Sequence, residues 1–259
     1  MNRKFSEIYS SSINNPEEFW KKISDDMFWF KKPTKILNQS NPPFYKWYED
    51  GVTNTCYNAL DVHIDQGRSN RAALIYDSPV TGNKNIFTYK ELRDKVSKFA
   101  GALQNQGISK GDRVAIYMPM IPEAVIAMLA CGRIGAVHSV VFGGFASNEL
   151  ASRIDDSKAK VLITASCGFE PGRTVEYKPL VDEALKLASH KIDKLILFQR
   201  QGHEVNLNAP KEISWEESLS NAKNVDCVEI KSNEYAYILY TSGTTGVPKG
   251  IVRDVGGHI

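Results

Sequence analysis

From residue 71 onward, short apolar runs alternate along the chain with segments of helical period. The runs lack the apolar and polar alternation of a half-exposed strand, so they predict strands that are buried on both faces. Strands of this kind form a parallel sheet that helices cover. The predicted strands lie at residues 72–76, 114–118, 137–142, 160–165, 194–198 and 235–240.

Helix signals fall between most of these runs. Thr88 is followed three residues later by Glu91, a capping box that begins a helix, and Gly107 is typical of the end of that helix. Further helices are predicted to begin at Pro122, at Ser147, near Leu180 and near Trp215. The interleaving predicts an α/β fold, with a doubly wound and largely parallel sheet that carries helices on both faces.

The first 60 residues follow a different pattern, because aromatic, Asn and Pro residues are dense there and no clear period is present. Large aromatic side chains bury much surface, so this density favours an irregular packed cap over a disordered tail. We therefore expect an aromatic-rich N-terminal cap over residues 1–65 and a second unit over residues 66–259.

Composition narrows the class of protein. The chain has 259 residues, of which 42% are hydrophobic, and a formal net charge of +2, so disorder is disfavoured. The balanced charge, without a long Lys/Arg block, also disfavours a nucleic-acid partner. Glu123, Arg133 and His138 interrupt the longest apolar stretch, so no membrane span is expected.

The four cysteines are scattered without metal-ligand or disulfide spacing. They indicate reduced thiols and a cytoplasmic location, with the mitochondrial matrix as the alternative. Cys131 is expected to be inert packing within a helix. His138, inside a predicted strand, is expected to be a hydrogen-bonded core residue and not a base.

The most informative segment follows the last predicted strand and reads TSGTTGVPKG, at residues 241–250. Its glycines permit close backbone approach, its hydroxyls donate hydrogen bonds, and its lysine supplies a positive charge, a composition suited to polyphosphate. It is not a Walker A loop, because the lysine is followed by glycine. The candidate phosphate-binding residues are Thr241, Ser242, Gly243, Thr244, Thr245, Gly246 and Lys249.

This segment resembles the phosphate-loop signature of the adenylate-forming superfamily. Upstream stretches such as GDRVAIYMPMIPEAVIAMLACGRIGAVHSVVFGGFA are similar to acetyl- and propionyl-CoA synthetases, so the chain resembles the N-terminal portion of a short-chain acyl-CoA synthetase. The propionyl-CoA branch fits best, because Arg253 stands where acetate enzymes commonly have His.

The resemblance also implies a coenzyme A site. Family enzymes hold the 3′-phosphate end of the coenzyme with an arginine in the loop that Arg173 matches, whereas Glu170 replaces a second arginine of many acetate enzymes. Gly143 and Gly144 either form a tight turn or line the coenzyme A channel. The candidate coenzyme A residues are Gly143, Gly144, Glu170, Pro171, Gly172 and Arg173.

The reaction that the resemblance implies joins propionate or acetate to ATP, giving an acyl-adenylate and pyrophosphate, and then transfers the acyl group to coenzyme A. Mg²⁺ is expected to arrive with ATP, near Thr245, without direct protein ligands. The family's adenylation lysine is expected beyond Ile259, so no catalytic residue is assigned within the chain, and the chain alone is expected to be inactive. The alternatives are a non-catalytic nucleotide- or coenzyme-A-binding module and a structural fragment.

Overall fold

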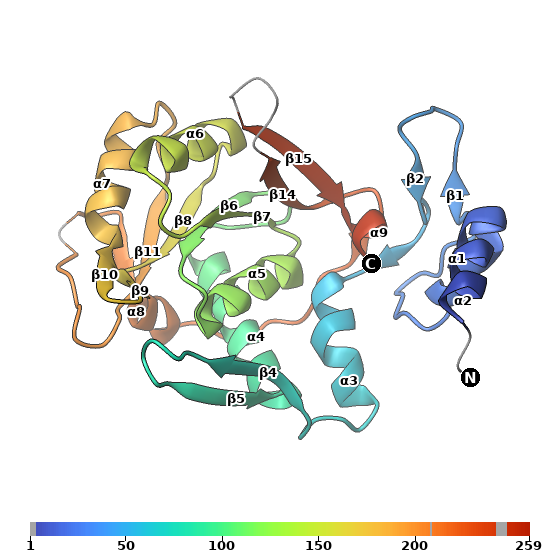
Figure 1. Cartoon of the computed structure of the whole chain (residues 1–259), viewed down its shortest axis with the longest axis horizontal. Helices are drawn as coiled ribbons and strands as arrows, with labels where there is room; N and C mark the ends of the chain where they lie inside the picture. Colours follow the sequence, from blue (N-terminus) through green and yellow to red (C-terminus); the bar gives the residue numbers. More distant parts are fainter. Residues whose placement is uncertain (1–3, 208, 242–247) are drawn as a thin grey trace.

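A seven-stranded sheet forms the centre of the computed structural model, which describes residues 4–207, 209–241 and 248–259 (Figure 1). The strand order is β12-β11-β8-β6-β7-β14-β15, and every neighbouring pair is parallel except β14 with β15. The sheet strands are β6 (Arg113–Met118), β7 (Val137–Phe142), β8 (Val161–Ala165), β11 (Lys194–Phe198), β12 (Glu212–Ser214), β14 (Tyr235–Thr241) and β15 (Lys249–Asp254).

Helices cover both faces of this sheet. One face carries α4 (Tyr89–Asn105), α5 (Pro122–Ile134) and α8 (Trp215–Ser220), and the other carries α6 (Ser147–Ser157) and α7 (Tyr177–Leu187) (Figure 1). Along β6, Ile116 packs into the first core and Tyr117 into the second, as strand geometry requires. The predicted doubly wound, largely parallel fold is confirmed.

The predicted ends of the first two helices that cover the sheet are also confirmed. Thr88 and Glu91 form the reciprocal capping box of α4, with the Glu91 N–H donating to Thr88 Oγ1 at 3.2 Å and the Thr88 N–H donating to Glu91 Oε2 at 2.8 Å. Gly107 follows the helix with a φ of 82°. Pro122 begins α5 as expected, and that helix ends at Ile134.

The strand predicted at residues 72–76 exists, but it lies outside the main sheet. It is β4 (Ala72–Asp77), which pairs antiparallel with β5 (Lys84–Thr88), a strand that the sequence pattern did not predict. The short connection explains this placement, because a parallel crossover needs a dozen residues or more. The remaining short strands are β1 (Leu37–Asn38), β2 (Lys46–Trp47), β3 (Val52–Thr53), β9 (Cys167–Glu170), β10 (Arg173–Glu176) and β13 (Ile230–Lys231).

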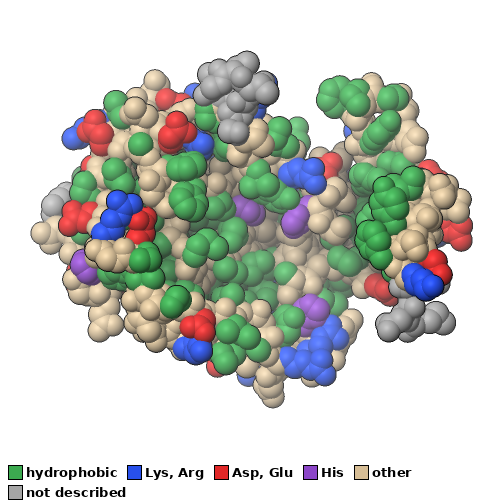
Figure 2. Space-filling view, in the orientation of Figure 1, with side chains coloured by type: hydrophobic (Ala, Val, Ile, Leu, Met, Phe, Trp, Pro, Cys, Tyr) green, Lys and Arg blue, Asp and Glu red, His purple; other side chains and the backbone are tan. Residues whose placement is uncertain are grey.

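The N-terminal segment is aromatic-rich and largely irregular, as predicted, with short helices added. Trp29, Ile36 and Tyr48 form a small core of their own, against which Trp20 and Trp47 pack. The helices are α1 (Phe5–Asn14), α2 (Pro16–Ser24), the π-helix η1 (Tyr57–Asp61), α3 (Val62–Asp65) and, at the other end of the chain, α9 (Val255–His258). Figure 2 shows hydrophobic side chains gathered over α1 and α2, whose exposed members include Phe5, Tyr9 and Ile13.

His138 differs from its prediction in one respect. Its ring lies 5.5 Å from that of Tyr237 and stacks on it, but its Nδ1 is buried and has no hydrogen-bond partner among the described residues. The expected hydrogen bond at that atom is therefore absent. Burial, and to a smaller extent the nearby His258, lower the pKa of His138 to about 4.

This neutral imidazole predicts a loss of stability in acid. The unfolded chain takes up a proton at His138 near pH 6.5, whereas the folded chain takes it up only near pH 4. The free energy of unfolding should therefore fall by up to about 3 kcal/mol between these values. Urea unfolding of His138→Phe should show a shallower pH dependence in this window. The exposed His203→Gln serves as the control, and parallel curves for His138→Phe and the unsubstituted chain would contradict the interpretation.

Candidate functional site

The carboxyl ends of the parallel strands meet at one edge of the sheet. The chain leaves β6 toward α5 on one face, whereas it leaves the two neighbours of β6, β7 and β8, toward α6 and α7 on the other face. Loops that diverge in this way open a crevice outside the strand ends, and open α/β sheets bind their ligands there.

A crevice of about 400 Å³ lies at this place. Two predicted site residues, Gly143 and Glu170, line it. Its other lining residues include Tyr76, Met118, Met120, Phe142, Gly168, Phe169, Tyr177 and Arg200.

Gly143 and Gly144 form the turn between β7 and α6, and the structure explains why glycine stands at both positions. A Cβ on Gly143 would meet the carbonyl oxygen of Met118 at 2.7 Å and would also collide with the Tyr177 hydroxyl. Gly144 has a φ of 111°, which side chains rarely adopt. The turn and the crevice wall are therefore the same feature, because Gly143 serves in both.

The segment from Glu170 to Arg173 is the tip of the β9–β10 hairpin. Pro171 and Gly172 make the turn, and Gly172 has a φ of 77°. Arg173 Nη2 lies 2.6 Å from Glu170 Oε2, and Arg173 Nε donates to the same oxygen at 2.7 Å. The arginine that was predicted to hold a phosphate is therefore already paired with the carboxylate that replaces the second arginine.

Arg200 is a functional candidate that the sequence did not reveal. It follows β11, is only 9% exposed, and its guanidinium lies over the Phe169 ring at 4.7 Å from the centroid. It forms no ion pair with any residue in the described part of the chain, whereas its backbone N–H donates to Ser166 Oγ. The Glu123 carboxylate is near enough for the Arg200 charge to favour its ionised form, which partly offsets the rise in the pKa of Glu123 on burial. A guanidinium that lines a crevice beside an aromatic ring, without a direct ion pair, is suited to binding an anion.

Tyr177 supplies a neutral hydroxyl at the crevice floor. Burial, with smaller contributions from Tyr117 and Glu170, raises the pKa of Tyr177 to about 12, so the hydroxyl keeps its proton at neutral pH. Tyr117, behind it, donates to the Phe145 carbonyl and accepts from the Gly144 N–H. These contacts hold the glycine turn against the sheet.

Most of the predicted phosphate loop lies outside the described residues, namely Ser242, Gly243, Thr244, Thr245 and Gly246. The flanking positions are described: Thr241 ends β14 and Lys249 begins β15, and the two are partners in the antiparallel register. The strand β15 itself was not predicted. Because β14 is parallel to β7, Thr241 lies at the same edge of the sheet as the crevice.

The end of β14 is tied to the neighbouring helix. The Tyr240 hydroxyl donates to Asp156 of α6 at 2.6 Å, and the Arg153 guanidinium lies over the Tyr240 ring. These contacts fix the strand that leads into the predicted phosphate loop.

A larger hollow of about 740 Å³ lies at the opposite edge of the sheet. Arg113 and Val137, the first residues of β6 and β7, line it together with Lys110 and Lys231. None of the predicted site residues reaches this edge in the described ranges. In the same ranges no helix is both long and apolar enough to cross a membrane.

Comparisons with known proteins agree with the fold and with the predicted family. A family model described as AMP-binding enzyme matches residues 61–259, and one described as acetyl-coenzyme A synthetase N-terminus matches residues 5–59. The chain is 52% identical over 251 residues to acyl-CoA synthetase short-chain family member 3, mitochondrial, of Homo sapiens, covering 96% of this chain and 37% of that protein.

Two further relatives extend this result. Acetyl-coenzyme A synthetase of Streptomyces coelicolor is 44% identical over 255 residues, covering 98% of this chain and 39% of that protein. The solved structure of acetoacetyl-CoA synthetase from Streptomyces lividans superposes with a TM-score of 0.87 at 25% identity, covering 99% of this chain and 39% of that one. The chain thus spans less than two fifths of the length of these relatives, and the predicted likeness to the N-terminal portion of short-chain acyl-CoA synthetases is confirmed.

Proposed function

The chain belongs to the AMP-binding enzyme family, and we propose that it carries the nucleotide-phosphate and coenzyme A sites of an ATP-dependent acid–thiol ligase. In this reaction a short carboxylate attacks the α-phosphate of ATP, pyrophosphate leaves, and the thiol of coenzyme A then displaces AMP. The residues 1–65 would form the cap of this ligase and residues 66–259 the first part of its AMP-binding domain. The cytoplasm is the proposed location, although the human relative is named as mitochondrial.

The proposed ATP site is the loop that joins β14 to β15. Its hydroxyls, backbone N–H groups and Lys249 would stabilise the negative charge that builds on the departing pyrophosphate. Mg²⁺, bound with ATP near Thr245, would neutralise part of the same charge. No nucleophilic side chain is needed, because the substrate carboxylate is the nucleophile.

The proposed coenzyme A site is the 400 Å³ crevice. The observation that carries the proposal is Arg200, because its guanidinium lines the crevice beside the Phe169 ring and forms no direct ion pair among the described residues, which suits it to hydrogen-bond a phosphate. Arg173 would reach the 3′-phosphate at the outer end, where its charge is shared with Glu170. Gly143 and Tyr177 line the crevice together and would form the wall along which the coenzyme passes.

Propionate is the proposed carboxylate, with acetate as the alternative. The support is Arg253 and the sequence of the loop before α7, which resemble propionyl-CoA synthetases. One methylene group contributes only about 1–3 kcal/mol to discrimination, so both acids would be substrates at high concentration.

Arg200→Gln should weaken the binding of coenzyme A by about 10–100-fold, because a charge-assisted hydrogen bond contributes about 1.5–3 kcal/mol. Isothermal titration with coenzyme A measures this, and pantetheine, which lacks the phosphates, should bind equally to both forms. Arg93→Gln on α4, whose side chain pairs with Asp94, is the matched control. An equal loss for pantetheine, or no loss for coenzyme A, would show that Arg200 does not bind phosphate.

Glu170→Gln should have the opposite effect, since it frees the Arg173 guanidinium. We expect coenzyme A to bind about two- to fivefold more tightly, the size of an exposed ion pair's coupling. The binding of 3′-dephospho-coenzyme A should not change, which separates this effect from a general change of charge. Weaker binding of coenzyme A to Glu170→Gln would mean that the carboxylate itself contacts the ligand.

The chain by itself is proposed to bind nucleotide without completing the reaction. A nonhydrolysable ATP analogue with Mg²⁺ should raise the melting temperature of the chain, and should raise it less in Lys249→Ala. In a separate assay, ATP and propionate together should give no release of pyrophosphate. Propionate-dependent pyrophosphate release would refute the proposed inactivity. Failure of every nucleotide to shift the melting temperature would instead favour the structural fragment.

A further inference from the structure

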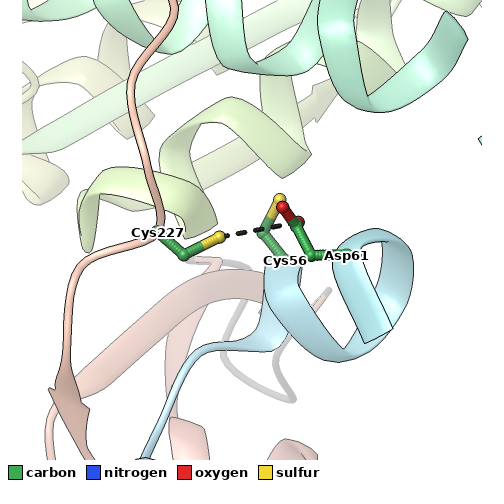
Figure 3. A group of neighbouring side chains, drawn as sticks. All are labelled: Cys56, Asp61 and Cys227. Carbon is green, nitrogen blue, oxygen red and sulfur yellow. Dashed lines mark hydrogen bonds between the residues drawn. The ribbon is translucent and has the colours of Figure 1, made fainter. Parts of the chain in front are cut away.

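A second cluster of chemically reactive side chains lies away from the crevice. The sulfur atoms of Cys56 and Cys227 and a carboxylate oxygen of Asp61 all lie within 4.8 Å of one another. Figure 3 shows Cys227, on the connection between α8 and β13, with its side chain directed toward Cys56 and Asp61 at the η1 helix. No local spacing in the sequence indicates this group, because the two cysteines are far apart in the chain.

The backbone around the cluster is held in place by side-chain hydrogen bonds. Asn54 Oδ1 accepts from the Cys56 N–H at 2.9 Å, and Asn54 Nδ2 donates to the Val228 carbonyl at 2.9 Å. One amide therefore ties the turn that carries Cys56 to the segment that carries Cys227. The π-helical turn of η1 also brings Asp61 close to Cys56, and π-helical turns are frequent at functional sites.

The charges of the cluster are balanced. Arg133, which is 2% exposed, binds both carboxylate oxygens of Asp61, at 2.8 and 3.1 Å. The Cys227 thiol donates to Asp61 Oδ2 at 3.7 Å, and Arg133 Nη1 donates to the Cys56 sulfur at 3.7 Å. With both thiols protonated, the guanidinium and the carboxylate cancel.

We propose that Cys56, Cys227 and Asp61 form a binding site for a soft divalent cation of the zinc class. Two thiolates and one carboxylate oxygen are zinc or cadmium ligands, whereas Mg²⁺ prefers oxygen alone. Thiolates bound to one tetrahedral zinc ion lie about 3.8 Å apart, given Zn–S bonds of about 2.3 Å, so only a small contraction of the cluster is required. Cys227 is only partly buried, which leaves a fourth position for water.

Binding of the cation leaves the net charge of the cluster unchanged. The cation enters with two positive charges, two S–H bonds break, two metal–sulfur bonds form, and two protons leave to solvent. The buried cluster therefore stays neutral, with Arg133 and Asp61 still paired through the oxygen that the cation does not take. The bound cation would clamp the connection before β13 to the turn that follows β3.

The test is a titration of the chain, reduced with a thiol-free phosphine, with Cd²⁺ alone. We expect one equivalent to bind, with the near-ultraviolet absorption of thiolate-to-cadmium charge transfer. Cys227→Ser should lose this absorption and bind at least tenfold more weakly. Cys131→Ser, which removes a buried thiol outside the cluster, should match the unsubstituted chain.

A second measurement needs no variant. Zn²⁺ should slow the alkylation of Cys227 by iodoacetamide at least tenfold, with the modified residue identified by mass spectrometry. Unchanged alkylation, or cadmium binding of equal strength in Cys227→Ser, would overturn the proposal. It would also be overturned if the fully reduced chain retained no cation.

Discussion

Burial of both faces of the parallel sheet is the constraint on which this structure depends. Because β6 packs Ile116 into one core and Tyr117 into the other, both faces need helices: the chain leaves β6 toward one face and leaves its neighbours β7 and β8 toward the other. That divergence opens the crevice at the carboxyl edge and brings the end of β14 to the same edge. The proposed ligand sites are thus consequences of how the core is covered.

Two buried arginines illustrate how the same group can serve stability or binding. Arg133 is satisfied by a bidentate pair with Asp61 and by the Val225 carbonyl, so it joins distant segments of the chain. Removing one partner of such a buried pair typically lowers the free energy of unfolding by about 3–5 kcal/mol. Arg200 has an aromatic neighbour and the charge of Glu123 nearby, but no bidentate carboxylate pair among the described residues, and its guanidinium lines the crevice, which points to an external anion.

The sequence predicted the main strands because fully buried strands leave continuous apolar runs, and it predicted α4 because the Thr88–Glu91 box is a local signal. Short, partly exposed strands such as β5 and β15 carry no such pattern and were missed. The ion pair between Glu170 and Arg173 could have been predicted, because the two residues flank a Pro-Gly turn at a spacing of three. Arg200 and the Cys56–Cys227 cluster depend on contacts made only in the folded chain, which no local spacing encodes.

The central claim is that the crevice between the diverging loops receives a phosphate-bearing ligand through Arg200. A crystal structure of the chain with bound coenzyme A tests it most directly. The account predicts a phosphate oxygen within hydrogen-bond distance of the Arg200 guanidinium, with the coenzyme passing beside Gly143. Coenzyme A bound in the hollow at the amino edge of the sheet, with Arg200 turned to a protein carboxylate, would contradict it.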